Sequence, residues 1–180
     1  MQKKLFSWMT IMLMAFVCVG FTACGSDDDD NGGGGSGGGS TKVNGQSYNM
    51  SYGFWDPGKS NVYFEFSNYN LLNKNPSAAP SKIDILTIGV SGITSPEPGT
   101  YNATVELYSF APTATESIHY PGGAGRVSLT ISKSGDKYTF TIPETTITYY
   151  PNGDGGGKTG TSVPFSFSWT GTLTQADFSE

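Results

Sequence analysis

The chain has 180 residues, of which 13 % are aromatic and 14 % charged, and its formal net charge is −5. The aromatic content excludes a wholly disordered chain, and an acidic chain without a basic stripe does not have the composition of a nucleic-acid-binding protein. One histidine and two cysteines exclude most transition-metal and thiol chemistry. We therefore expect no cofactor, no metal and no nucleic-acid partner.

Residues 1–23 have the composition of a secretory signal peptide. Lys3 and Lys4 precede a run, residues 5–21, that is apolar apart from one serine and one threonine, and small residues follow it. The alternative is a transmembrane anchor, but the run is at the short end of the spanning range of about 17–25 residues. A cleaved signal peptide is therefore the prediction for this segment.

The end of this segment, Phe21-Thr22-Ala23-Cys24, resembles the lipobox of bacterial lipoproteins. The resemblance implies cleavage just before Cys24 and attachment of lipid to that residue. Cys18 is the alternative, but Val17 precedes it where the family has a small residue. Several acyl chains at Cys24 would hold the protein firmly at the membrane, because each buried methylene contributes about 0.8 kcal/mol.

A short acidic segment follows Cys24 directly. It resembles the surface-export signal of Bacteroidetes lipoproteins, and its residues are Ser26, Asp27, Asp28, Asp29 and Asp30. The resemblance implies a location in the outer membrane, lipid-anchored and facing the cell exterior. The alternative is a solvated acidic tether without an addressing role.

Residues 31–40 read NGGGGSGGGS, a composition typical of a flexible linker. We therefore predict a lipidated cysteine and tether over residues 24–41 and a single folded domain over residues 42–180.

Within the domain, apolar residues recur with period two, which predicts β-strands and no helix. Asn44-Gly45 between two strand-like segments is a strong hairpin signal. The turn residues 56–60 predict a second hairpin, in which Phe54 would pair with Val62 and Tyr52 with Phe64.

Three further features mark the remaining strands. Residues 82–91 are apolar on both sides, which predicts a strand covered on both faces. A turn at Gly135-Asp136 would place Ile131 opposite Phe140, and the phase of alternation changes after Pro143, which predicts a bulge or break there.

The last strand has the clearest alternation. One face carries only apolar side chains and a glycine, and its members are Val163, Phe165, Phe167, Trp169, Gly171 and Leu173. Pro164 lacks an amide hydrogen, which predicts that the strand begins there or lies at an edge. In total we predict seven to eight antiparallel strands, arranged as a β-sandwich or, alternatively, as an up-and-down lipocalin-like barrel.

Catalytic motifs are weak throughout. Residues 153–159 approach the phosphate-loop pattern, but Asn152 stands where a glycine is needed. His119 has no cysteine near it, and no serine lies in a nucleophile-elbow sequence. The strand carboxylates Glu65, Asp84 and Glu106 could support catalysis only if two of them converged. We therefore predict that the protein is not an enzyme.

The candidate ligand-binding residues are aromatic residues that alternation places off the apolar faces or in loops. They are Trp55, Tyr63, Tyr120, Tyr149 and Tyr150. Exposed aromatic rings suit stacking on sugars or contacts with another protein.

The domain is similar to the small all-β surface lipoproteins of Bacteroidetes, a group largely without assigned function. The resemblance is specific over residues 21–30 and general over residues 42–180. We expect a non-catalytic binding or accessory module on the cell surface, with a glycan or another surface protein as its partner. The alternative is a structural or assembly protein of the envelope or of a fimbria-like structure. An unpaired edge at the Pro164 strand would favour that alternative through strand addition.

Overall fold

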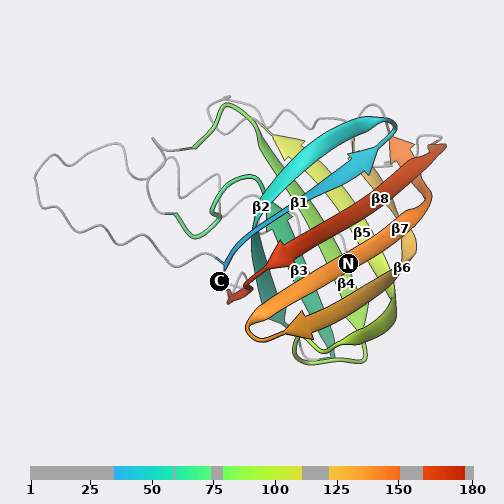
Figure 1. Ribbon diagram of the computed structural model, residues 1–180. Coiled ribbons are helices and arrows are strands. Elements are labelled where there is room, and N and C mark those ends of the chain that lie inside the picture. Colours follow the sequence, from blue (N-terminus) through green and yellow to red (C-terminus); the bar gives the residue numbers. More distant parts are fainter. Residues whose placement is uncertain (1–34, 59, 74–78, 111–121, 151–159, 177–180) are drawn as a thin grey trace, which may run out of the picture.

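The computed structural model describes residues 35–58, 60–73, 79–110, 122–150 and 160–176. These residues form a single antiparallel sheet with one short parallel addition (Figure 1). The strands are β1 (Gly35–Val43), β2 (Gln46–Pro57), β3 (Asn61–Ser67), β4 (Ile83–Ser91), β5 (Gly99–Phe110), β6 (Gly122–Ser134), β7 (Lys137–Tyr150), β8 (Thr161–Gly171) and β9 (Thr174–Gln175).

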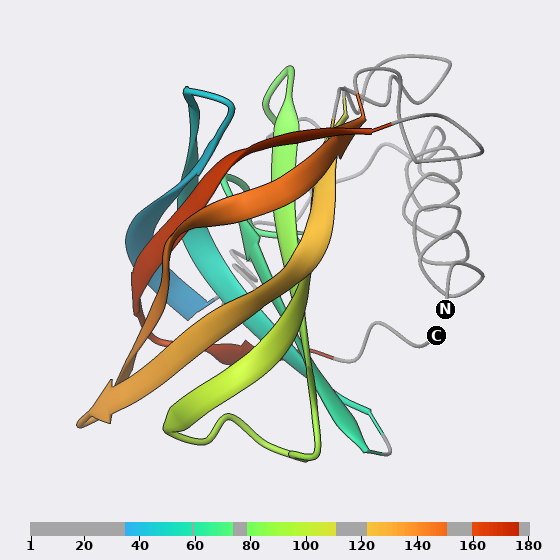
Figure 2. The same ribbon diagram turned by 90° about the vertical axis from the view of Figure 1, so that its right-hand side faces the viewer.

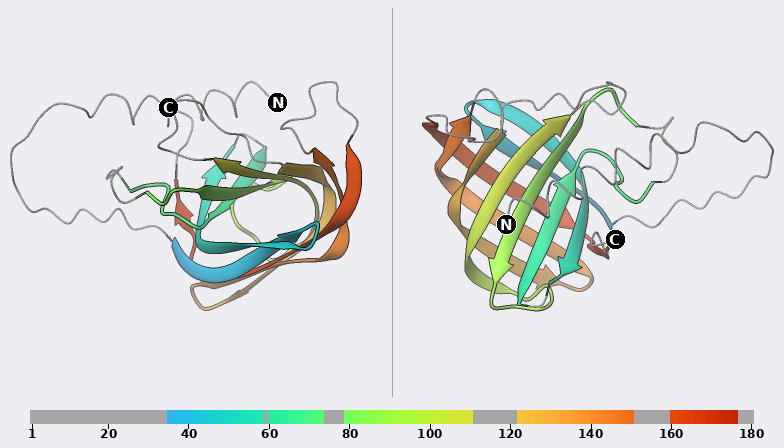
Figure 3. Two further views of the ribbon diagram at one scale, coloured as in Figure 1. Left: turned by 90° about the horizontal axis from the view of Figure 1, so that it is seen from above. Right: turned by 180° about the vertical axis from the view of Figure 1, so that it is seen from behind.

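The sheet closes into a barrel. Strands β1 to β8 each pair antiparallel with the next, and β1 pairs with both β2 and β8, so the first and last long strands join (Figure 3). β9 lies parallel to β2 and opposes Phe54 and Trp55. The all-β antiparallel prediction is confirmed, and the chain adopts the up-and-down barrel rather than the sandwich. Joining β1 to β8 leaves one continuous wall, whereas a sandwich needs two separate sheets.

The strand that closes the barrel comes from the segment predicted to be tether. Gly35 to Thr41 lie in β1, so the folded part begins no later than Gly35 and not at residue 42. A Cβ atom on Gly37 would lie 2.6 Å from Cε2 of Trp169, and one on Gly53 would lie 2.7 Å from Cη2 of the same indole. Glycine is needed here because the backbone approaches the tryptophan ring closely. Composition indicates a coil, but this long-range packing makes the segment a strand.

Two turns and one bulge follow the sequence closely. Asn44 and Gly45 have φ of 50° and 78°, as a two-residue hairpin turn with both central residues in the left-handed region requires. Ile131 lies opposite Phe140 across the Gly135-Asp136 turn. The β7–β8 register shifts between Ile142 and Thr145, so the predicted bulge at Pro143 is confirmed.

The predicted pairing of β2 with β3 is wrong by three positions. Phe64 lies opposite Trp55, and Phe54 lies opposite Glu65 instead of Val62. The cause is a change of phase in β2, where Met50 and Gly53 both face the barrel interior. A register shift between β1 and β2, from Ser36 to Gly39, accompanies this change.

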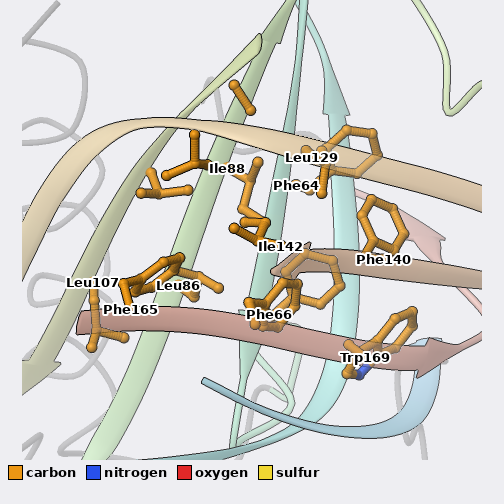
Figure 4. Packing of buried hydrophobic residues seen from close by; sticks show 14 of the residues in the cluster. Phe64, Phe66, Leu86, Ile88, Leu107, Leu129, Phe140, Ile142, Phe165 and Trp169 are labelled. Carbon is orange, nitrogen blue, oxygen red and sulfur yellow. The ribbon is translucent and has the colours of Figure 1, made fainter. Parts of the chain in front are cut away.

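Aromatic rings fill the interior of the barrel. The ring of Phe66 lies 5.0 Å from that of Phe140, 4.8 Å from that of Phe167 and 5.0 Å from that of Trp169 (Figure 4). Aliphatic residues from the facing strands complete this inner cluster, and Leu86, Ile88 and Leu129 are fully buried. Such a packed interior is the main source of the stability of a small barrel.

A second, smaller cluster lies on the outer wall over β2, β3 and β4. Its buried members are Phe54, Tyr69, Leu71, Ile83, Ile85 and Ala176. We call it the outer cluster. It confirms that β4 is covered on both faces, since Leu86, Ile88 and Val90 belong to the inner cluster.

β8 is not an edge strand, so the prediction from Pro164 that this strand could lie at an edge is wrong. It pairs with β7 on one side and with β1 on the other. Pro164 is tolerated because it lies just beyond the last β1–β8 pair, Val43 with Phe165, near the beginning of the strand.

Candidate binding site at the loop end of the barrel

The two ends of the barrel differ in the length of their connections. At one end β2–β3, β4–β5 and β6–β7 are joined by short connections at residues 58–60, 92–98 and 135–136. At the other end, the upper end in Figure 1 and in Figure 2, lie the Asn44-Gly45 turn and the last residues of β3, β5 and β7. We call this the loop end. In the sequence, the longer stretches 68–82, 111–121 and 151–160 follow these three strands. Binding residues commonly lie where loops gather on a rigid scaffold.

A polar network lies at the loop end. Asp84 is 7 % exposed, accepts a hydrogen bond from the Ser109 hydroxyl and has its Oδ1 atom 3.2 Å from Nζ of Lys82. Lys82 Nζ also lies 5.0 Å from the centre of the Tyr48 ring. Residues from β2, β4 and β5 therefore meet there. Ser109 lies two residues after Leu107 and Asp84 two residues before Leu86, and since both leucines face the interior, so do Ser109 and Asp84.

The segment after β3 braces this network. The side chain of Asn68 accepts a hydrogen bond from the amide of Asp84 at 3.0 Å and donates one to the Lys82 carbonyl at 3.1 Å. This pair of bonds fixes the backbone that carries the lysine and the aspartate. The network is therefore held both by the barrel wall and by the segment that follows β3.

Tyr48 is the aromatic member of the network. Burial raises its phenol pKa, and the negative charge of Asp84 and the neighbouring Tyr149 raise it further. The phenol is therefore neutral at physiological pH, and it donates a hydrogen bond of 2.9 Å to the Gln46 side chain. Tyr48 and Tyr149 both pack with partial exposure against the inner cluster.

This arrangement suits binding better than catalysis. Two partly exposed rings, an ammonium group and a carboxylate offer stacking surfaces and hydrogen-bond partners for a polar ligand. Within the described ranges, no three histidine, cysteine, aspartate or glutamate residues gather as a metal site would require. Asp84 faces the interior, whereas Glu65 and Glu106 lie on the outer wall, so Asp84 forms no carboxylate pair with either of them.

The structure does not bring the predicted aromatic residues together on one surface. Trp55 packs against the inner cluster near the short-connection end, and Tyr63 lies on the outer wall against Gly89. Tyr149 is at the loop end. Tyr150 pairs with Gly122 through its backbone, but its side chain lies outside the described part, as does Tyr120.

Trp55 faces inward because of the phase change in β2, which alternation counted from Met50 does not reveal. Tyr48, Lys82 and Ser109 were not predicted as site residues. The sequence does contain a signal for Ser109. The alternating positions Val105, Leu107 and Ser109 share one face, so a polar residue stands at an inward position near the end of the strand.

Cys24, the acidic segment after it, His119 and residues 153–157 all lie outside the described residues. Among the residues that are described, no helix is long and apolar enough to cross a membrane.

The fold and the site together define an eight-stranded, up-and-down β-barrel with a polar loop end. No family model matches the chain, and neither a curated protein nor a solved structure matches it.

Proposed function

We propose that the protein is a lipid-anchored, non-catalytic binding module of the outer membrane surface that binds glycans at the loop end of its barrel. The observation that carries the proposal is the convergence of Tyr48, Lys82, Asp84 and Ser109 on one end of a filled barrel. The interior is occupied by side chains, so a ligand would bind at the end of the barrel and not within it.

The geometry of the chain supports this use of the loop end. β1 begins at Gly35 and runs toward Asn44, so its first residue lies at the short-connection end of the barrel. Residues 25–34 could span roughly 35 Å when extended, at about 3.3–3.6 Å per residue. An anchor at Cys24 would therefore be joined to the barrel at the end opposite the loop end, through a tether long enough to leave the loop end accessible.

Glycans are the favoured ligand class because of the chemistry of the network. Sugar rings stack on flat aromatic side chains, and their hydroxyls need both donors and acceptors. The neutral phenol of Tyr48 can donate and accept, while Asp84 accepts and Lys82 donates. An exclusively anionic or cationic ligand would use only half of this set.

The test compares two matched lysine–tyrosine pairs on a glycan array. Tyr48→Ala removes the ring beside Lys82, and Tyr138→Ala removes the ring beside Lys133, whose Nζ lies 4.8 Å from it near the Gly135 turn. We expect Tyr48→Ala to weaken binding about tenfold or more and Tyr138→Ala to leave it unchanged. Equal losses in both variants, or no glycan bound by the native chain, would contradict the proposal.

The alternative, a structural or assembly protein of the envelope, loses its main support in the pairing of β8. Strand addition needs an unpaired edge, and β8 is paired on both sides from Phe165 to Gly171. Cross-linking on intact cells separates the two functions. A stoichiometric protein partner would favour assembly, whereas captured polysaccharide would favour binding.

A further inference from the structure

Two buried polar groups lie side by side on the outer face of the barrel wall. Glu65 in β3 is 7 % exposed, and its Oε2 atom has no hydrogen-bond partner within the described part of the chain. Thr87, directly opposite it in β4, is 8 % exposed, and its hydroxyl also lacks a partner there. Directly opposed side chains have Cβ atoms about 4.5–5.5 Å apart. Buried polar groups are nearly always hydrogen-bonded, so an adjacent pair with free bonding capacity is unusual and can serve a ligand.

This pair lies in a row of outward side chains that crosses four strands. Phe54 in β2 lies opposite Glu65, and Glu106 in β5 lies opposite Thr87. Neighbouring strands are about 4.7–4.9 Å apart, so Thr87 stands between two acidic residues whose backbones are separated by about 9–10 Å. Glu106 accepts a hydrogen bond from the Tyr108 hydroxyl at one oxygen. Neither Glu65 nor Glu106 forms an ion pair with a described residue.

The ring of Tyr63 borders the row. Tyr63 precedes Glu65 by two residues on the same face of β3, and its side chain is half-buried. A Cβ atom on Gly89 in β4 would lie 3.4 Å from Cε1 of that ring. Because Gly89 follows Thr87 by two residues on the same face, the ring extends from β3 toward β4 alongside both unpartnered groups. The face of an aromatic ring attracts a cation and also packs against an alkyl chain.

The charges in this part of the wall are negative. Strands β2 to β5 contain no lysine or arginine. Burial raises the pKa of Glu65 to about 8, and the negative charge of Asp56 in β2 contributes. Arg126 in β6 lies opposite Thr104 of β5, three strands from Glu65. An anionic ligand would therefore be repelled here, whereas a cation would compensate the buried acid.

A primary ammonium group matches this row. It carries three N–H donors and a compact positive charge, and Glu65, Thr87 and Glu106 offer acceptors from three adjacent strands. A metal ion is a poorer match, because within the described ranges no three acids, histidines or cysteines gather as its ligands. Tyr63 and the buried Ile85 border the row with apolar surface, which suits the methylene chain of a lysine better than the hydroxyls of an amino sugar.

We propose that the outer wall binds a lysine side chain of another protein, with its ammonium group over Thr87 between Glu65 and Glu106 and its methylene chain against Tyr63. This site lies on the opposite face of the wall from the network at the loop end, which faces the interior. It therefore does not depend on glycan binding, and one molecule has room for a glycan and a protein partner at the same time.

The pH dependence of binding follows from the state of Glu65. Lysine binds the carboxylate, and in the free protein this form predominates only above about pH 8. A lysine ammonium, with an ordinary pKa of about 10.4, stays charged between about pH 6 and 9. Affinity should therefore rise by up to about tenfold per pH unit below pH 8 and level off above it. The other titratable groups of this face carry no positive charge, and they are Asp56, Tyr52, Tyr69, Glu106 and Tyr108.

Titration of the full chain with Nα-acetyl-lysine methylamide, followed by NMR at about pH 8.5, tests the site. We expect saturable shifts of the amides of Glu65 and Thr87, and none with Nα-acetyl-norleucine methylamide, which has the alkyl chain without the ammonium group. Glu65→Gln should weaken binding by about tenfold or more, because the charge that pairs with the ammonium group is lost. Thr87→Val should weaken it by about threefold or more. Thr130→Val, at an exposed position of β6, is the matched control and should leave it unchanged.

Several results would overturn the proposal. The first is the absence of saturable shifts at Glu65 and Thr87, and the second is native affinity in either Glu65→Gln or Thr87→Val. Affinity that does not rise with pH would show that the carboxylate of Glu65 is not the group bound. Glucosamine bound as tightly as the lysine probe would exclude lysine as the preferred ligand. Glu65→Gln should also leave glycan binding at the loop end unchanged, so failure of one site can be distinguished from failure of the other.

Discussion

The two faces of β3 bury side chains of different chemistry in different surroundings. Phe66 points into the barrel and is surrounded by rings from β7 and β8, whereas its neighbour Glu65 points outward, opposite Phe54 of the outer cluster. Both side chains are buried. The inner side chain lies inside the closed wall, whereas the outer one lies beside a smaller cluster on one side of that wall. We infer that the stability of the barrel and the integrity of the outer cluster are separable properties.

Replacing a phenylalanine on each face is the strongest test of that comparison. Phe66→Ala and Phe54→Ala remove the same ring from fully buried sites on neighbouring strands. We expect Phe66→Ala to lower the free energy of unfolding by about 3–5 kcal/mol, because the closed wall cannot collapse into the cavity. Phe54→Ala should cost less, because Tyr69 and Leu71, which pack in the same cluster, belong to a connecting segment that can adjust toward the vacated space. Urea denaturation measures both, and equal losses would show that the two faces are equally rigid.

Glu65→Gln should stabilise the protein, with an effect that depends on pH. The pKa of Glu65 is raised in the folded state, so its contribution is fully favourable below about pH 4.5 and is lost as the pH rises to about 8. The variant should unfold like the native chain at pH 4 and be more stable by an amount on the order of 4 kcal/mol at pH 8. Thermal unfolding across this range measures the difference. A constant difference between the two proteins would contradict the burial of an ionisable group.

Two adjacent glycines test whether the glycine-rich segment is part of the wall. A Cβ on Gly37 would collide with the Trp169 ring, whereas a Cβ on Gly38 would have no atom within 4 Å. We expect Gly37→Ala to destabilise the barrel by about 1–3 kcal/mol. Gly38→Ala should be neutral or slightly stabilising, because alanine has less freedom to lose on folding. If the segment were a flexible tether, both variants would unfold like the native chain.

The smallest expected effect concerns the phenol at the loop end. Asp84→Asn removes the charge that helps raise the pKa of Tyr48, so that pKa should fall, while burial keeps it above the ordinary value. NMR titration of the Tyr48 ring measures the change. Asp136→Asn, in the turn at the opposite end of the barrel, is the control and should leave Tyr48 unaffected.

Strand positions, two turns and one bulge could be predicted because local residues determine them. Asn44-Gly45 admits few conformations other than its turn, and Pro143 cannot take a regular place in a ladder. The closure of the barrel could not be predicted in this way. Its evidence is a contact between Gly37 and Trp169, which are far apart in the sequence, and glycine composition alone indicates a linker.

In the candidate site, too, features set by local residues were predicted and features set by long-range packing were not. Tyr149 was predicted as a binding residue and lies at the loop end, but Trp55 was predicted on the wrong face. Alternation counted from Met50 fails once β2 changes phase, and that change depends on how β1 packs beside it. Asp84 and Ser109 are directly opposed in β4 and β5, so their contact depends on the register of these two strands, which was not predicted. The approach of Lys82 to Tyr48 depends on how β2 and β4 lie on either side of β3.

The seam between β1 and β8 also has a consequence for the order of events during synthesis. It joins Gly37 to Gly171, nearly the first and last residues of the barrel. Contacts between such distant residues form slowly, because a long loop must close first. A chain that leaves the ribosome or crosses a membrane from its amino terminus cannot complete this wall until its final long strand has emerged. The wall of the barrel therefore stays open until β8 has been synthesised and can pair with β1.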